Sequence, residues 1–320
     1  MKNKKWGYIL WIVFFILLIC IPLLTNNYQQ YIINLIFLSF LVCFGLAVLL
    51  GYAGQMAFAS AGFLGIGAYT TGLSMVWLGV SYWTAFLVSC LVSLLFAIFL
   101  GFIGFRLRRY YLAITTLAFT LAMRFFYVTA GDLTFGPSGF NIPRASLFGF
   151  SLNTDRRVYY LVLFVVLLFS VLTRNIIKSK VGRAFMTIRV NEEAAASAGI
   201  NVNGYKMLAF VICGILGGVT GALYTQVLGR IAPEEFGMLP MFLHFVIVVL
   251  GGLGSFFGLI ISTVVVTLIP EFIRGFVGLE ELLYGLIIII MILAAPRGLY
   301  GFIRKYSPVK WREKMYGNVE

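Results

Sequence analysis

The chain has 320 residues, of which 61% are hydrophobic and only 11% are charged. Because soluble proteins carry about 25% charged residues, this composition excludes a soluble globular protein. The net charge of +13 does not indicate a nucleic-acid partner, since the cations lie in short loops and at the termini, where they set membrane topology.

Apolar segments long enough to cross a bilayer as helices recur along the whole chain. They predict an all-α polytopic membrane protein, with 1–320 as a single domain surrounded by membrane lipid. No small-residue cleavage site follows the first segment, which favours a retained span over a signal peptide. The ten predicted transmembrane helices are 7–24, 31–50, 56–78, 82–104, 110–130, 158–173, 205–228, 239–250, 255–273 and 282–295.

The distribution of charge predicts the orientation of these spans. With both termini cytoplasmic, the inner segments 1–6, 105–109, 174–206 and 297–320 hold 18 cations, whereas the outer segments hold 5. Cations concentrate on the cytoplasmic side of membrane proteins. The loop 174–206 and the basic tail 297–320 are therefore expected in the cytoplasm.

The loop 174–206 is the longest polar interruption between the spans. Within it, Asn191 is a good N-cap, and Glu192 and Glu193 fall in the first turn, where the helix dipole favours anions. Gly199 is placed to end the helix. These residues predict one short, Ala-rich helix of about two turns, whose low surface suits the docking of a soluble motor protein.

Two glycine-rich segments interrupt apolar spans, at Gly51-Tyr52-Ala53-Gly54-Gln55 and at Gly251-Gly252-Leu253-Gly254-Ser255. They indicate a possible pseudo-repeat of two halves with Gly-interrupted helices, and such positions point to the working site of a transporter. Alternatively, the glycines simply permit close helix packing. The span count puts both interruptions near the inner membrane surface.

The sequence lacks the residues that ATP binding and metal-dependent catalysis would need. The dipeptide Gly-Lys of a phosphate-binding loop does not occur, so the chain is not expected to bind ATP itself. His244 is the only histidine, which excludes a multi-histidine metal site. Its place in an apolar helix disfavours a Ser-His-Asp triad, and we expect it to be buried and neutral, with one hydrogen-bond partner. No catalytic residue, metal site or cofactor is predicted on this chain, and the energy for transport must come from a separate protein.

Motifs along residues 31–301 resemble those of the permeases of branched-chain amino acid ABC importers. The block at 111–118 resembles the M-type subunit of that family. The segments that carry the resemblance are 45–69 (around Gly51-Tyr52-Ala53-Gly54-Gln55), Tyr111-Leu112-Ala113-Ile114-Thr115-Thr116-Leu117-Ala118, Gly136-Pro137-Ser138-Gly139, 182–202 (with Glu193-Ala194-Ala195 and Gly199), 249–255 and Pro296-Arg297-Gly298-Leu299.

The resemblance implies a multi-pass permease in the bacterial plasma membrane that imports leucine, isoleucine and valine. It implies a second permease subunit, two ATPase subunits that bind ATP and Mg²⁺, and an extracytoplasmic substrate-binding protein, for which the outer loop 131–157 is the expected contact. The loop 174–206 corresponds to the family's coupling segment. The expected ATPase-coupling residues are Arg183, Phe185, Arg189, Glu192, Glu193, Ala194, Ala195 and Gly199.

The expected substrate is a zwitterion with an apolar side chain, which needs polar groups beside apolar walls without a strong fixed charge. Each candidate hydroxyl or amide has the alternative role of joining two helices by a hydrogen bond. The candidate path residues are Gly51, Gly54, Gln55, Ser60, Tyr69, Thr115, Thr116, Gly251, Gly252 and Gly254, with Thr70 and Thr71 as further hydroxyls.

Other functions stay open at this point. Permeases with the same motifs import urea or short amides, and a stand-alone secondary carrier or channel is a less favoured reading. A membrane-embedded enzyme is disfavoured, because acids, histidines and metal ligands do not cluster in the sequence.

Overall fold

The computed structural model describes residues 18–19, 21–107, 109–147, 150–151 and 154–273, with the single positions 282, 285, 286, 289 and 293. The predicted spans 7–24 and 282–295 lie mostly outside these residues. The basic tail 297–320 and both termini also lie outside them.

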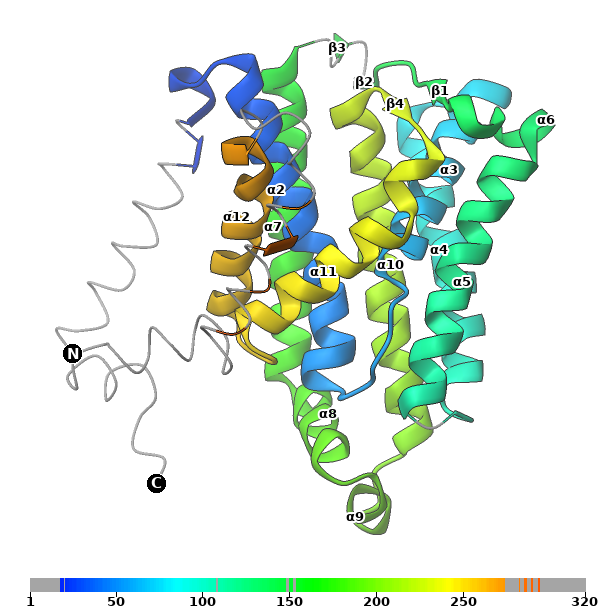
Figure 1. The fold of residues 1–320 in the computed structure, drawn as a ribbon, viewed down its shortest axis with the longest axis vertical. Coiled ribbons are helices and arrows are strands. Elements are labelled where there is room, and N and C mark those ends of the chain that lie inside the picture. Colours follow the sequence, from blue (N-terminus) through cyan, green and yellow to red (C-terminus); the bar gives the residue numbers. More distant parts are fainter. Residues whose placement is uncertain are drawn as a thin grey trace, which may run out of the picture.

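Long apolar helices make up most of the described chain and run between two opposite ends of the molecule (Figure 1). Within the described residues, five segments are long and apolar enough to cross a membrane, namely Asn27–Tyr52, Tyr82–Gly104, Tyr110–Thr129, Asp155–Lys178 and Val202–Leu228. The helices are α2 (Asn27–Leu46), which continues into the π-helical η1 (Ala47–Tyr52), α3 (Ser60–Trp77), α4 (Tyr82–Gly104), α5 (Arg109–Thr129), α7 (Asp155–Lys178), α10 (Val202–Leu228), α11 (Met238–Gly251) and α12 (Phe256–Ile273).

Short elements connect these helices at the two ends. One end carries α8 (Lys180–Val190) and α9 (Glu192–Ser197) (Figure 1). The other carries α6 (Gly131–Thr134), η2 (Gly136–Ser138), β1 (Phe140–Asn141), β2 (Ser146–Leu147), β3 (Phe150–Ser151), β4 (Arg230–Ile231) and η3 (Pro233–Phe236). Strand β1 pairs antiparallel with β4, with Phe140 opposite Ile231, and β2 pairs antiparallel with β3. Apart from these two-residue strands, the described chain has the predicted helical class.

The helices occupy the places of the predicted spans from 31–50 to 255–273, and 82–104 has the predicted bounds. Helix α3 begins four residues after the predicted start at 56, because residues 54–59 form no regular secondary structure. Helix α7 is longer than the predicted 158–173, because the charged residues at its two ends are also helical. The total of ten spans and the cytoplasmic termini stay predictions.

Helix α10 lies in the middle of the bundle and packs on α3 and α4 through small residues. A Cβ atom added to Gly67 of α3 would lie 2.4 Å from the carbonyl oxygen of Gly218, and one added to Gly221 would lie 2.3 Å from that of Leu64. On the α4 side, a Cβ on Gly214 would lie 2.4 Å from the Cβ of Ala97. Such close backbone approach supplies the van der Waals contact that holds helices together in lipid.

Candidate coupling site and translocation path

Helix α9 has the predicted N-terminal cap. The Oδ1 atom of Asn191 accepts hydrogen bonds from the backbone N–H groups of Glu193, at 2.9 Å, and Ala194, at 3.1 Å. These bonds satisfy two of the donors that a helix start leaves unpaired. The sequence of this turn therefore fixes where α9 begins.

Gly199 ends α9 as predicted. It has a φ angle of +80°, which a residue without a Cβ adopts easily. Its N–H donates to the carbonyl of Ala196 at 2.9 Å, and the N–H of Ile200 donates to that of Ala195 at 3.1 Å. This pair of bonds is the Schellman motif, and it turns the chain back toward α10.

The loop 174–206 holds more helix than the single short one predicted for it. Helix α8 precedes α9, and its Ala184, Phe185 and Ile188 are buried against the rest of the chain. Phe185 is fully buried, with its ring centroid 6.1 Å from that of Tyr205. This residue, predicted as a contact for the motor protein, instead anchors α8 inside the chain.

An ion pair ties α9 to the start of α10. The Nζ atom of Lys206 lies 2.7 Å from Oε2 of Glu192, and the Lys206 side chain is only 9% exposed. A charge-assisted bond at this distance is stronger than a neutral one. The pair therefore connects α9 to α10, the central helix of the bundle.

Arg189, at the end of α8, joins the coupling loop to both glycine segments. Its guanidinium Nη1 donates a hydrogen bond to the carbonyl oxygen of Gly51. A Cβ on Gly51 would lie 2.8 Å from the backbone nitrogen of Gly254, and one on Gly54 would lie 2.8 Å from Cγ of Arg189. We call these four residues, Gly51, Gly54, Arg189 and Gly254, the glycine junction.

Glycine is required at the junction for two reasons. The φ angles of Gly54 and Gly254 are +70° and +89°, a region that other residues adopt only at a cost of about 1–2 kcal/mol. Any side chain at Gly51 would also meet the backbone of the second glycine segment. Residues predicted for coupling and residues predicted for the path thus share one contact site at the α8 end of the bundle.

Beyond the junction, residues 54–59 form an irregular segment that returns toward the middle of the bundle, where α3 begins (Figure 1). The N–H of Phe58 donates to Oγ1 of Thr116 at 2.8 Å, and Oγ1 of Thr120 donates to the Phe58 carbonyl at 2.8 Å. Irregular backbone at membrane depth is tolerated only where the protein satisfies its polar groups. Helix α5 does this here.

Two further path candidates lie beside this segment. Gln55 is 3% exposed, and neither polar atom of its side chain has a hydrogen-bond partner among the described residues. Oγ of Ser60 lies 3.3 Å from Nδ1 of the buried His244 on α11, which is the kind of single partner predicted for this histidine. Thr115 is separate, because its hydroxyl bonds only to the Tyr111 carbonyl of its own helix.

Tyr69 belongs to an aromatic cluster nearer the other end of α3. Its ring stacks on that of Tyr127 of α5, with centroids 3.9 Å apart, and Phe236 of η3 meets both rings edge-on. The cluster lies beneath the connection between α10 and α11. Tyr69 therefore occupies a different level of the bundle from the glycine junction.

The remaining two glycines shape the turn after α11. A Cβ on Gly251 would lie 2.8 Å from Oγ of Ser262 on α12, so this glycine lets α11 and α12 pack closely. Gly252 has a φ angle of +90° and follows the last turn of α11. Both support the geometry of the second glycine segment without joining the junction themselves.

Two exposed apolar residues of α8 are missing from the predicted coupling set. Met186 is 46% exposed and Val190 is 83% exposed, on the side of α8 away from its buried residues. Their spacing of four places them on one helix face, and this spacing is the sequence signal that identifies them. Arg183, Glu193 and Ala194 are also exposed, whereas Ala195 is fully buried.

Comparison with known proteins gives one family. Residues 29–295 match the family described as the permease component of branched-chain amino acid transport systems. The chain is 30% identical to the high-affinity branched-chain amino acid transport system permease protein LivM of Salmonella typhimurium, covering 90% of this chain and 74% of that protein.

Two further relatives come from Escherichia coli. Its LivM protein is 28% identical, covering 92% of this chain and 75% of that protein. Its probable ABC transporter permease protein YphD is 30% identical over 41% of this chain and 42% of its own length. No solved structure matches the chain.

Proposed function

The chain belongs to the permease components of branched-chain amino acid transport systems, multi-pass proteins of the bacterial plasma membrane, and we propose that it is the M-type subunit of an ATP-driven importer for leucine, isoleucine and valine. It forms the translocation path together with a second permease subunit. ATP and Mg²⁺ bind to two ATPase subunits, and a substrate-binding protein delivers the amino acid from outside.

The glycine junction is the observation that carries this proposal. In this proposal α8 and α9 lie in the cytoplasm, and we call this helix pair the elbow. The bond from Arg189 to Gly51 joins the elbow directly to the two interrupted helices of the membrane bundle. A motor that tilts α8 moves Arg189 and, with it, both glycine segments. Energy supplied at the cytoplasmic face therefore reaches the transmembrane helices through the Arg189 side chain and the close backbone contact between Gly51 and Gly254.

The exposed face of the elbow is the proposed docking surface for the ATPase. It combines apolar and small residues with charges, as protein interfaces do. The buried partners Phe185, Ile188 and Ala195 hold this surface rigid from below. The docking residues are Arg183, Met186, Val190, Glu193 and Ala194.

Docking is tested by co-purification of the ATPase with the permease pair from membranes. The double variant Glu193→Arg with Gly199→Arg should lose the ATPase, because it places two cations on the surface and strains the end of α9. Asp132→Arg, which makes the same charge reversal as Glu193→Arg on exposed α6 at the opposite end, is the control and should retain it. Undiminished ATPase recovery with the double variant would remove the docking proposal.

The substrate is tested by uptake in cells that express the whole transporter. Radiolabelled leucine should accumulate, and unlabelled isoleucine and valine should compete for uptake. Urea and short amides should not compete, since they lack the zwitterion and the branched side chain. Uptake of urea without uptake of leucine would reassign the substrate while leaving the permease class unchanged.

A further inference from the structure

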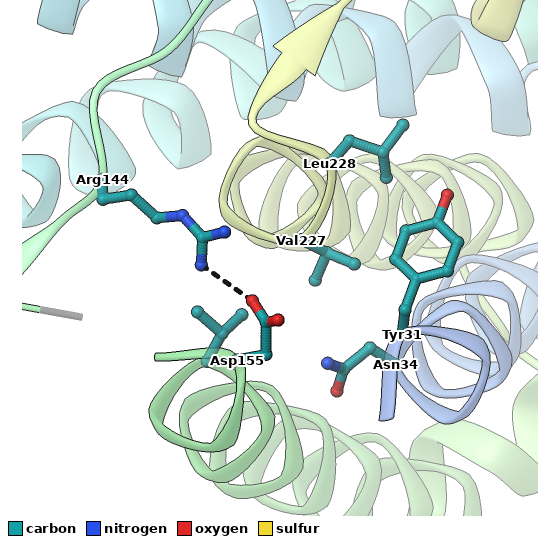
Figure 2. A pocket seen from close by; sticks show the side chains of 7 residues that line it. Tyr31, Asn34, Arg144, Asp155, Val227 and Leu228 are labelled. Carbon is teal, nitrogen blue, oxygen red and sulfur yellow. Dashed lines mark hydrogen bonds and ion pairs between the residues drawn. The ribbon is translucent and has the colours of Figure 1, made fainter. Parts of the chain in front are cut away.

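A cavity of about 240 Å³ lies at the end of the bundle opposite α8 and α9. Figure 2 shows it between the start of α2, the start of α7 and the end of α10, with the segment that carries Arg144 at one side. It is lined by Tyr31, Asn34, Arg144, Asp155, Val158, Val227 and Leu228. Since α7 leads into the cytoplasmic α8, this end of the bundle is the outer end.

One side of the cavity carries both signs of charge. Nη1 of Arg144 lies 3.1 Å from Oδ1 of Asp155, and the two side chains are 39% and 41% exposed. A guanidinium has five N–H donors and a carboxylate has two acceptor oxygens, so this one bond leaves each group able to bind further. An anionic and a cationic group of one small ligand can therefore bind here side by side.

Asn34 supplies a polar group at the inner wall. Its side chain is 2% exposed, and its Oδ1 has no hydrogen-bond partner within the described part of the chain. Burying an amide without a partner is unfavourable, and the carbonyl oxygen of an amide calls for an N–H donor. Figure 2 shows Asn34 beside Asp155, with the amide nitrogen of Asn34 on the Asp155 side, so one ammonium group can donate to both residues once the amide turns its oxygen toward the ligand.

The rest of the lining is apolar and branched. Val158, Val227 and Leu228 form this wall, and Val158 is almost fully buried. The cavity is smaller than the range of about 300–1,000 Å³ that is usual for drug-sized ligands. It therefore suits a small molecule that has adjacent opposite charges at one end and a compact aliphatic group at the other.

We propose that this cavity is an outer binding site for a zwitterionic α-amino acid with a branched aliphatic side chain. Arg144 binds the carboxylate, Asp155 and Asn34 bind the ammonium, and Val158, Val227 and Leu228 pack on the side chain. The inference rests on the proposed function for its substrate class. It adds a binding position in the permease itself, where an amino acid released outside is held before it moves inward.

The binding step exchanges one ion pair for two. The bond between Arg144 and Asp155 opens, and each partner then pairs with the opposite end of the ligand. Because both side chains are partly exposed, the original pair contributes little to stability, so its opening opposes binding only weakly. The ammonium also satisfies the Asn34 amide, which is unpaired in the described structure.

The site is tested on the whole transporter in lipid nanodiscs, without the substrate-binding protein, by equilibrium binding of tritiated leucine. Arg144→Gln, Asp155→Asn and Asn34→Leu should each raise the Kd by about tenfold or more, a change of about 1.4 kcal/mol or more. Arg156→Gln, at a neighbouring residue outside the cavity lining, is the matched control and should stay within twofold. Retained ATPase subunits and basal ATP hydrolysis show that each variant is folded.

A second readout does not depend on the absolute affinity. Isocaproate has the aliphatic group and carboxylate of leucine but lacks the ammonium. Asp155→Asn should reduce the preference for leucine over isocaproate, whereas Arg156→Gln should leave it unchanged. An unchanged preference in Asp155→Asn would overturn the site.

Further outcomes distinguish failure of the proposed binding site from failure of the proposed importer function. Normal leucine uptake by the native transporter, with native leucine affinity in all three cavity variants, would overturn the site and leave the importer function standing. Failure of the native transporter to bind or import any branched-chain amino acid would overturn both. Variants that weaken capture of the substrate-binding protein but not leucine binding would make the Arg144–Asp155 pair a docking contact and overturn the site.

Discussion

At the scale of single residues, two positions have properties set by a few close neighbours. Gly54 is defined by its φ angle of +70° and by the Arg189 side chain beside it. The pKa of Glu235 in η3 is set by the partial burial of its carboxyl group next to the Tyr224 hydroxyl. Each gives a prediction in which another residue of the same type is the control.

Gly54→Ala should reduce leucine uptake by about tenfold or more without reducing the amount of permease in the membrane. The added Cβ would lie 2.8 Å from Cγ of Arg189 and would disturb the glycine junction. Gly79→Ala is the control, because Gly79 also has a positive φ angle, +62°, but has nothing within 4 Å of an added Cβ. Both variants then carry a backbone strain of about 1–2 kcal/mol, and they differ only in the contact of the added Cβ with Arg189. Equal uptake by the two variants would argue against a role for the junction.

Glu235 should make the protein less stable as the pH rises. Burial raises the pKa of its carboxyl group from an ordinary 4.5 to about 7, although hydrogen bonds from the Ala232 backbone and Tyr224 and the charge of Arg230 oppose this. The folded protein therefore keeps a proton that the unfolded chain releases near pH 4.5. Stability is full below pH 4.5, falls as the pH rises, and has lost this contribution above about pH 7.

The measurement is the unfolding temperature of the purified transporter between pH 5 and pH 8. The native protein should unfold at a lower temperature at pH 8, and Glu235→Gln should reduce this difference because its side chain does not titrate. Glu234→Gln, at the exposed neighbouring residue, should keep it. A difference of the same size in Glu235→Gln would assign the pH dependence to another group.

At the scale of elements, the irregular segment 54–59 depends on α5. Thr116→Val should lower the unfolding temperature and the uptake rate, since it leaves the Phe58 N–H without the acceptor that lies 2.8 Å away. An unsatisfied buried donor costs about 1–3 kcal/mol, or roughly 2–4 °C for each kcal/mol in a protein of this size class. Thr115→Val is the matched control, because the Thr115 hydroxyl bonds only within α5. Equal effects of the two changes would mean that the Phe58 bond does not hold the segment.

The elements that the sequence predicts well are those determined locally. Asn191 and Gly199 mark the ends of α9 through their own backbone bonds, and continuous apolar runs mark the long helices. Helix α8 is missed because its signal, the burial of Phe185 and Ile188, depends on the bundle beneath it. The late start of α3 is missed for the same reason, since the partners of Phe58 lie on α5.

The sequence indicates which residues belong to the candidate site better than it indicates how they are arranged in space. Both glycine segments are visible as sequence patterns, but Gly51 and Gly254 are far apart in the chain, and their contact depends on how α2 and α11 pack. Arg189 is expected to face a partner protein, whereas it binds the Gly51 carbonyl. The outer cavity combines residues of α2, α7 and α10 that share no motif, so only the folded chain reveals it.

At the scale of the whole molecule, the glycine junction and the outer cavity lie at opposite ends of the bundle. Helix α10 spans the distance between them: its first residues include Lys206, paired with Glu192 of α9, and its last include Val227 and Leu228 of the cavity wall. Helix α2 runs between the same two ends, from Tyr31 and Asn34 to η1 and the junction. Helices α10 and α2 therefore both connect the end of the bundle that carries α8 and α9 to the cavity at the other end.

This arrangement predicts that Arg189→Ala uncouples ATP hydrolysis from transport. The ATPase should still dock, because the exposed face of α8 and α9 is unchanged, and ATP should still be hydrolysed. The tilt of α8 would no longer reach Gly51, so the number of ATP molecules hydrolysed for each leucine imported should rise by about fivefold or more, within the 1–3 kcal/mol usual for coupling between sites. Lys180→Ala, an exposed position on the same helix, is the control and should keep the native ratio. Both rates are measured in proteoliposomes that contain the complete transporter and its binding protein. A loss of docking would lower both rates together, so the outcome that contradicts this prediction is an unchanged ratio with both rates at their native values. That outcome would show that force reaches the membrane helices by another route, such as the Lys206–Glu192 pair or the Phe185–Tyr205 contact.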